Sequence, residues 1–124
     1  MNIVFFPVKD TTAKLTKLCR IAEGHLAQKE PLLFLVPDKA AYDFLDKLFW
    51  SSDNFLPHPT LLTISTELLP CSSVFNLRPS ALLEGAKTIY EFEDHTSPEK
   101  FQLSKHRYQT YRDQNFPITI ENFI

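Results

Sequence analysis

The stretch Leu32-Leu33-Phe34-Leu35-Val36, followed directly by Pro37 and Asp38, decides the fold that this sequence predicts. Five consecutive apolar residues are short enough for a strand, and they leave no polar position for solvent, so both faces of that strand should be buried. Pro37-Asp38 then starts a helix, because an acidic residue is stabilised at the positively polarised helix N-terminus. Upstream, Glu30-Pro31 ends an earlier helix, because proline disfavours the helical conformation of the residue before it. The stretch is therefore a buried strand between two helices.

The same alternation extends to the N-terminus. Asn2–Val8 is another apolar run that suits a buried strand, and Asp10-Thr11-Thr12 supplies N-cap candidates for the helix that follows it. One apolar stripe of that helix contains Leu15, Leu18, Cys19, Ala22 and Leu26. The helix after Asp38 repeats the spacing with Ala41, Leu45 and Leu48. Strand, helix, strand, helix is typical of a parallel sheet with helices packed on its faces. We therefore expect one α/β domain over residues 1–124, a three-layer Rossmann-like fold with a parallel or mostly parallel sheet.

The second half of the chain predicts shorter elements. The expected strands are Leu61–Ser65, Val74–Leu77 and Thr88–Phe92. Ala81-Leu82-Leu83 is expected to form a helical turn. Ser97-Pro98-Glu99 opens a last helix that runs to about Gln114, because proline is accepted in the first helical turn. The apolar tail, Phe116–Ile124, is expected to dock back on the body of the domain.

The composition argues against several classes of protein. A net charge of −2 and a pI near 6.1 disfavour strong direct binding of nucleic acid, which requires a basic surface. No apolar run approaches the roughly 20 residues of a membrane span, and the N-terminus lacks the features of a signal peptide. The chain has two cysteines, Cys19 and Cys71, and they are not in CxxC spacing. This low number of cysteines indicates a protein of the reducing cytoplasm. We expect a cytoplasmic protein.

The sequence contains only two glycines, Gly24 and Gly85. Phosphate-binding loops need clustered glycines so that backbone N–H groups can approach the ligand. Neither GxGxxG nor GxxxxGK[ST] occurs in this chain. We therefore expect the fold to lack a nucleotide-binding loop.

No set of residues predicts catalysis. The four histidines are scattered, without the HExxH or Cys/His spacing of a zinc site, and no Gly-x-Ser-x-Gly elbow frames a nucleophile. The grouped carboxylates are expected on solvated faces, because acidic side chains are seldom buried; they are Asp43, Asp46, Glu91, Glu93 and Asp94. We expect no enzyme activity, no cofactor and no metal.

The stretch from Leu45 to His58 is a candidate binding surface. It leaves a helix at Trp50, the only tryptophan, crosses a short Ser/Asp/Asn turn and ends with Phe55, Pro57 and His58. Rigid aromatic side chains are favoured anchors in protein contacts. The alternative is that Trp50 and Phe55 cover the core, because large aromatic residues are mostly buried.

The last helix is a second candidate. Between Ser97 and Arg112 it carries four basic residues against Glu99 alone, a local charge of +3. Phe101, Lys105, Tyr108 and Arg112 share one helical face, and such a face suits a short peptide with carboxylates and an aromatic end. Alternatively, Phe101, Ser104, Tyr108 and Tyr111 form a core seam and the cations are simply solvated. Tyr108 belongs to both patterns.

Three segments together resemble a known family, the chi subunit of bacterial DNA polymerase III, which is part of the clamp-loader assembly. The stretch Leu45-Asp46-Lys47-Leu48-Phe49-Trp50, with Phe55-Leu56-Pro57-His58 after it, resembles the family's Leu-Asp-x-x-Leu/Phe-Trp and Phe-x-Pro-His signature. Ser73-Val74-Phe75-Asn76-Leu77 resembles its apolar-Asn-Leu strand. Arg107-Tyr108-Gln109-Thr110-Tyr111-Arg112 resembles its closing Arg-Tyr-x-x-Tyr-Arg helix.

The resemblance implies a non-catalytic replication adaptor with two binding surfaces. One surface, with Trp50, Phe55, Pro57 and His58, would bind the psi subunit of the clamp loader or a helicase that competes for the same place. The other, on the last helix, would bind the acidic C-terminal tail of single-stranded-DNA-binding protein through Lys105, Tyr108 and Arg112, with Phe101 beside them.

Two positions depart from the family pattern. Lys105 stands where the family usually has an arginine, and Gln109 stands where a lysine is common. A lysine cannot form the bidentate contact that a guanidinium makes with a carboxylate. We therefore expect weaker and more salt-sensitive binding of the tail.

The residues alone leave two other functions open. A small flavodoxin-like enzyme or ligand-binding domain would use the carboxyl ends of the strands, with a deep pocket of converging polar groups near Pro37-Asp38. A stand-alone interaction module would bind the acidic tail but no psi-like partner.

Overall fold

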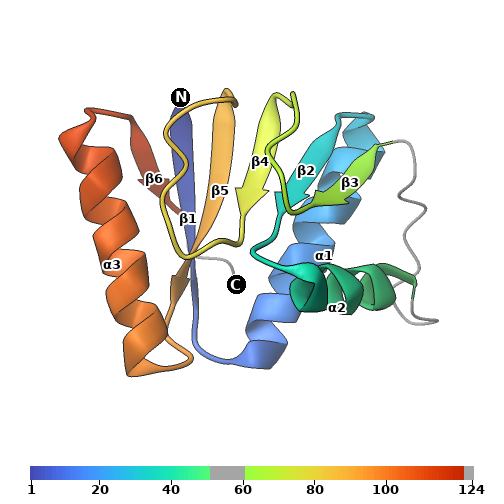
Figure 1. The fold of residues 1–124 in the computed structure, drawn as a ribbon, viewed down its shortest axis with the longest axis horizontal. Helices are drawn as coiled ribbons and strands as arrows, with labels where there is room; N and C mark the ends of the chain where they lie inside the picture. Colours follow the sequence, from blue (N-terminus) through green and yellow to red (C-terminus); the bar gives the residue numbers. More distant parts are fainter. Residues whose placement is uncertain (51–60, 122–124) are drawn as a thin grey trace.

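The computed structural model describes residues 1–50 and 61–121, and there it forms an open sheet of six strands in the order β3-β2-β4-β5-β1-β6 (Figure 1). Every neighbouring pair of these strands is parallel. The strands are Asn2–Val8 (β1), Leu32–Leu35 (β2), Leu62–Ser65 (β3), Ser73–Asn76 (β4), Thr88–Asp94 (β5) and Ile118–Ile120 (β6). The expected Rossmann-like α/β sheet is confirmed.

Three helices complete the layers, α1 (Thr11–Gln28), α2 (Lys39–Trp50) and α3 (Pro98–Asp113). Leu18 and Ala22 of α1 and Phe49 of α2 pack in one core cluster on one face of the sheet. Tyr111 of α3 and Leu82 of the β4–β5 connection pack in a second cluster on the other face. In Figure 1, α3 accordingly stands on one side of the molecule, well apart from α1 and α2.

The helices begin where the sequence predicts, because polar side chains cap their first turns. Asp10 accepts a hydrogen bond from the backbone N–H of Ala13 at 2.8 Å, and Asp38 does the same for Ala41 at 2.9 Å. The Ser97 hydroxyl accepts from the N–H of Lys100 at 3.2 Å, with Pro98 in the first turn of α3. Each cap satisfies a backbone donor that has no partner within its own helix.

One local prediction of secondary structure is wrong, and the docking of the tail takes a form that the sequence did not predict. Ala81-Leu82-Leu83 does not form a helical turn; the segment is irregular, with the Leu82 side chain buried and its N–H donated to the Tyr111 hydroxyl at 3.0 Å. The described part of the tail docks as expected, and it does so by forming β6, which pairs with β1 from Ile3↔Ile118 to Phe5↔Ile120. Ile118–Ile120 therefore extend the sheet itself, and residues 122–124 lie outside the described residues.

The expectation that the acidic residues of 91–94 are solvated is wrong for two of them. Glu91 is fully buried and Asp94 is 5% exposed. Alternation along β5 puts Glu91 on the face that α3 covers. There Glu91 forms an ion pair with Arg107, with Oε1 2.9 Å from Nε, and Arg107 is the one basic residue of α3 that the structure buries.

The Glu91 carboxylate also joins three segments of the chain. Its Oε2 atom accepts hydrogen bonds from the Tyr111 hydroxyl at 2.5 Å and from Nδ2 of Asn76 at 2.8 Å. Arg107 donates further to the carbonyl oxygens of Pro79 and Phe92, each at 3.3 Å. One buried carboxylate of β5 is thereby bonded to both β4 and α3, and Arg107 links it to the β4–β5 connection.

Burial of Glu91 raises its pKa to about 7, although the Arg107 guanidinium and the hydrogen bonds from Tyr111 and Asn76 act in the opposite direction. The folded pKa is thus above the unfolded one, so this group favours folding at low pH. That contribution is lost as the pH rises through about 7.

Replacing Arg107 by alanine should lower the free energy of unfolding by about 3 kcal/mol, because it leaves a buried carboxylate without its cation. The cost should be larger at about pH 8, where Glu91 is ionised, than at about pH 5.5, where it is mostly neutral. Urea denaturation at the two pH values measures both quantities.

Arg112→Ala is the matched control, since it removes an exposed cation from the same helix. It should change the free energy of unfolding by less than about 0.5 kcal/mol. Equal costs for the two variants, or a cost of Arg107→Ala that does not depend on pH, would contradict this account of the ion pair.

Candidate functional site

A hollow of about 250 Å³ lies between α3 and the strands beneath it, and we call it the α3 hollow. Its walls come from Phe5 of β1, Glu93 of β5 and Ile120 of β6, and from α3 with Ser104, Lys105, Tyr108 and Gln109. Phe5 and Ile120 are register partners in the β1–β6 pair, so the added strand β6 builds one wall. The hollow is therefore mainly apolar, with a lysine and a glutamate at its walls.

Tyr108 unites the two interpretations of the last helix. Its side chain is half-buried and its ring meets Phe5 edge-on, with the ring centroids 5.6 Å apart. Ser104 and Tyr111 are buried as the core seam predicts, whereas Lys105 is exposed. Tyr108 thus packs against the core with one part of its ring and lines the α3 hollow with another.

The structure brings some of the predicted tail-binding residues together and leaves others apart. Lys105 and Tyr108 both line the α3 hollow. Phe101 lies next to Lys105, whose Nζ is 5.4 Å from the centroid of the Phe101 ring, but Phe101 does not line the hollow. Arg112 is exposed in the last turn of α3 and is not part of the lining either.

Sequence reasoning missed the strand residues of this site. Phe5, Glu93 and Ile120 lie far from the last helix in the sequence, and they reach it only because β5, β1 and β6 are neighbours in the sheet. The alternation of β5 was the available signal, since it places Glu91 and Glu93 on the same face. The strand order, which long-range pairing sets, was not readable from the chain.

Trp50, the second candidate, is the last residue of α2 and is 46% exposed. Its neighbour Phe49 is fully buried and packs against Phe34, with ring centroids 5.0 Å apart. Phe49, not Trp50, therefore fills the core at this point. The other predicted residues of this surface, Phe55, Pro57 and His58, lie outside the described residues.

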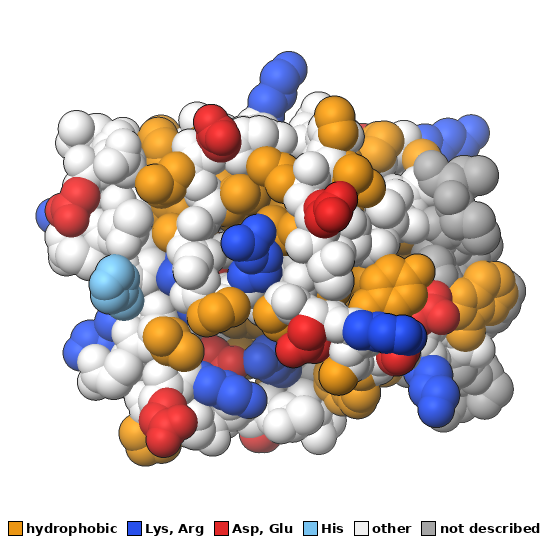
Figure 2. All heavy atoms as spheres, viewed as in Figure 1, with side chains coloured by type: hydrophobic (Ala, Val, Ile, Leu, Met, Phe, Trp, Pro, Cys, Tyr) orange, Lys and Arg blue, Asp and Glu red, His pale blue; other side chains and the backbone are white. Residues whose placement is uncertain are grey.

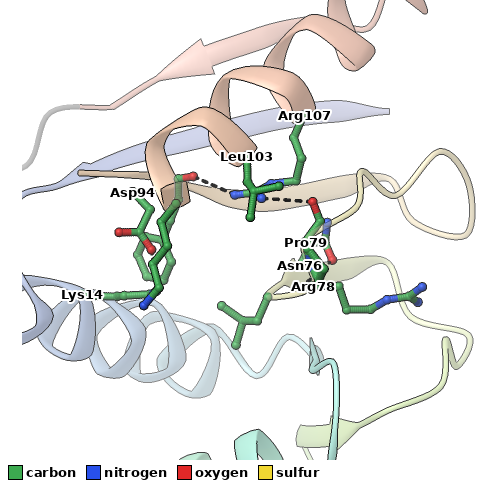
Figure 3. Close-up of a pocket in the computed structure, with 10 residues that line it drawn as sticks. Lys14, Asn76, Arg78, Pro79, Asp94, Leu103 and Arg107 are labelled. Atoms are coloured by element: carbon green, nitrogen blue, oxygen red, sulfur yellow. Dashed lines mark hydrogen bonds and ion pairs between the residues drawn. The ribbon is translucent and has the colours of Figure 1, made fainter. Parts of the chain in front are cut away.

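The carboxyl ends of β4 and β5 border a smaller hollow of about 170 Å³, shown in Figure 3. Three of its charged side chains are already engaged: Nζ of Lys14 is 2.6 Å from Oδ2 of Asp94, and Arg107 is paired with the buried Glu91 beneath the hollow. Burial raises the pKa of Asp94, but hydrogen bonds from Lys14 and Thr96 outweigh it and hold that pKa below its ordinary value. These groups are occupied in stabilising the fold.

The pocket that a flavodoxin-like protein would need near Pro37-Asp38 has a different lining here. A groove of about 390 Å³ includes Pro37, but its walls are mostly apolar side chains of α1 and α2. Asp38 is not among them and caps α2 instead. Over residues 1–50 and 61–121, no three His, Cys, Asp or Glu side chains are grouped as metal ligands.

Replacing Phe49 by alanine should lower the free energy of unfolding by roughly 3 to 5 kcal/mol, because it opens a cavity in the core. Trp50→Ala, one residue later, should cost less than Phe49→Ala, about 1 kcal/mol, because 46% of Trp50 is already exposed whereas Phe49 is fully buried. Urea denaturation followed by far-UV circular dichroism compares the two variants. A cost for Trp50→Ala as large as that for Phe49→Ala would show that Trp50 is a core residue.

A comparison with known protein families identifies the family of this chain. The family model described as "DNA polymerase III chi subunit, HolC" matches residues 1–119. No curated protein matches the sequence significantly. None of the helices in the part of the chain described by the structure is long and apolar enough to span a membrane. The family match covers nearly the whole chain, and the chain therefore belongs to the DNA polymerase III chi subunit family.

Proposed function

We propose that this protein is a non-catalytic adaptor that links the clamp loader, through psi, to the acidic C-terminal tail of single-stranded-DNA-binding protein. Membership of the chi family gives it a role in DNA replication as part of the DNA polymerase III machinery. The observation that carries the finer proposal is the separation of the two candidate surfaces. Trp50 ends α2, which packs on one face of the sheet, and Lys105 and Tyr108 lie on α3, which packs on the other.

The α3 hollow has the chemistry that an acidic tail with an aromatic end requires. Phe5, Tyr108 and Ile120 provide an apolar surface for a ring. Lys105 stands at the same wall as an exposed cation for a carboxylate. Its ammonium group makes point-charge contacts where a guanidinium would make two parallel hydrogen bonds. The tail should therefore bind through its ring first and through charge second.

The α2 surface supports the contact with psi, or with a helicase that uses the same place. Trp50 is an exposed aromatic residue, and Tyr42 and Phe44 of the same helix are 38% and 55% exposed. Aromatic side chains that become buried against a partner carry much of the binding energy in protein interfaces. Phe55, Pro57 and His58 would complete the surface, as the family signature implies.

The charge distribution favours protein partners over direct contact with DNA. The chain has a net charge of −2. On the face seen in Figure 2, lysine and arginine side chains are scattered among acidic and hydrophobic ones and form no continuous basic stripe. A surface that tracks the phosphate backbone would need such a stripe. The adaptor would thus reach single-stranded DNA through the protein that coats it, in the cytoplasm of a bacterial cell.

A labelled Asp-rich peptide that ends in Pro-Phe should bind saturably in fluorescence-anisotropy titrations at low salt. Lys105→Ala should weaken binding by up to about fivefold, the worth of one exposed charge pair, and Tyr108→Ala should weaken it further by removing the apolar wall. The affinity should fall as salt is added, because the charge contact is exposed.

Two controls separate the surfaces. Trp50→Ala should leave the affinity for the peptide unchanged, because α2 lies on the other face of the sheet. Lys100→Ala removes an exposed cation from the same helix, and it should also have little effect because Lys100 does not line the α3 hollow. Absence of saturable binding by the unmodified chain at any salt concentration would refute the tail site.

A further inference from the structure

Glu93 is the one carboxylate in the lining of the α3 hollow, and it faces the site where the tail is proposed to bind. It lies two residues after Glu91 on β5, so both side chains are on the face that α3 covers. The two carboxylates have different partners. Glu91 is held by the buried guanidinium of Arg107, whereas the contact of Glu93 within the described residues is with His95, with Oε1 3.2 Å from Nε2, and it is an ion pair when that imidazole is protonated.

The cation of the hollow does not neutralise Glu93. Lys105 takes part in no ion pair within the described residues, and its Nζ lies over the Phe101 ring. His95 also stacks on the Phe101 ring, with the two ring centroids 4.4 Å apart. The hollow thus contains the positive charge of Lys105, which is not in an ion pair within the described residues, and the negative charge of Glu93, whose side chain is 32% exposed.

A ligand carboxylate that enters with an aromatic ring is attracted by Lys105 and repelled by Glu93. The two contributions oppose each other, so Glu93 reduces the preference for a charged group on the residue that enters the hollow. Carboxylates of the ligand that stay outside the hollow would be further from Glu93 and less affected by it.

We propose that Glu93 is a specificity-determining residue that lowers the preference of the α3 hollow for a free C-terminal carboxylate. Glu93 therefore lets the hollow accept an acidic segment whose aromatic residue is internal to a chain, as well as one that ends there. The inference rests on the proposed binding of an acidic tail at this site and names the residue that limits its selectivity.

The test is a double-mutant cycle between the protein and the peptide. The Asp-rich peptide ending in Pro-Phe is titrated in two forms, one with a free C-terminal carboxylate and one with a C-terminal amide, against the unmodified chain and Glu93→Gln. Glu93→Gln should bind the free-carboxylate form up to about fivefold more tightly, the worth of one exposed charge contact, and the amide form with nearly unchanged affinity. The difference should shrink as salt is added.

Glu23→Gln is the matched control, because it removes the same charge from an exposed position on α1, on the opposite face of the sheet. It should shift neither titration. A urea denaturation curve of Glu93→Gln that matches that of the unmodified chain establishes that the fold is intact.

The outcomes separate this inference from the proposed function. If Glu93→Gln changes both titrations equally, Glu93 only holds His95 against Phe101, and the inference is overturned while tail binding stands. If only Glu93→Gln binds the free-carboxylate peptide, the inference is supported and tail binding by the unmodified chain is refuted. If neither protein binds either peptide, the proposed site fails and the inference fails with it.

Discussion

The buried ion pair between Glu91 and Arg107 is the interaction on which the α3 side of this molecule depends. Its carboxylate is bonded at the same time to α3, through Arg107 and Tyr111, and to β4 through Asn76. Successive residues of a helix are about 100° apart, so an inward Arg107 fixes the rotation of α3 about its axis. Lys105 is then exposed and Tyr108 lies at the edge of the core. The geometry of the α3 hollow is a consequence of this buried contact.

Much of the fold was predictable because local chemistry and long-range packing agree. The apolar run of β2, the caps Asp10 and Ser97 and the stripe of α1 all formed as the sequence indicates. What could not be predicted depends on strand order. The sequence predicts Glu91 to be solvated, but Glu91 is buried because α3 covers that face of β5. Likewise, Ile118–Ile120 are β-branched and alternate in polarity as in a strand, but three residues are too few to predict β6, which forms by pairing with the free edge of β1.

Only the helix residues of the candidate site could be predicted from the sequence; the strand residues could not. Helical spacing identified Lys105 and Tyr108, but it could not place Phe5, Glu93 or Ile120 opposite them. The same spacing grouped Arg112 with Lys105, although Arg112 lies about two turns further along and outside the hollow. For Trp50, by contrast, the family signature and the partial exposure of the side chain both favour a role in binding a partner. The sheet lies between α2 and α3, and the proposed adaptor would use this separation to bind two partners at once.

Simultaneous binding is the central claim, and one titration tests it most directly. The labelled acidic peptide is titrated into the chain alone and into the chain saturated with its cognate psi subunit, with Trp50→Ala as the variant that should not be saturated. The account predicts the same dissociation constant for the peptide in both titrations, and a complex that contains all three components. Displacement of the peptide by psi, or a weakening of about tenfold or more, would mean that the two surfaces overlap and that the chain does not bridge its partners.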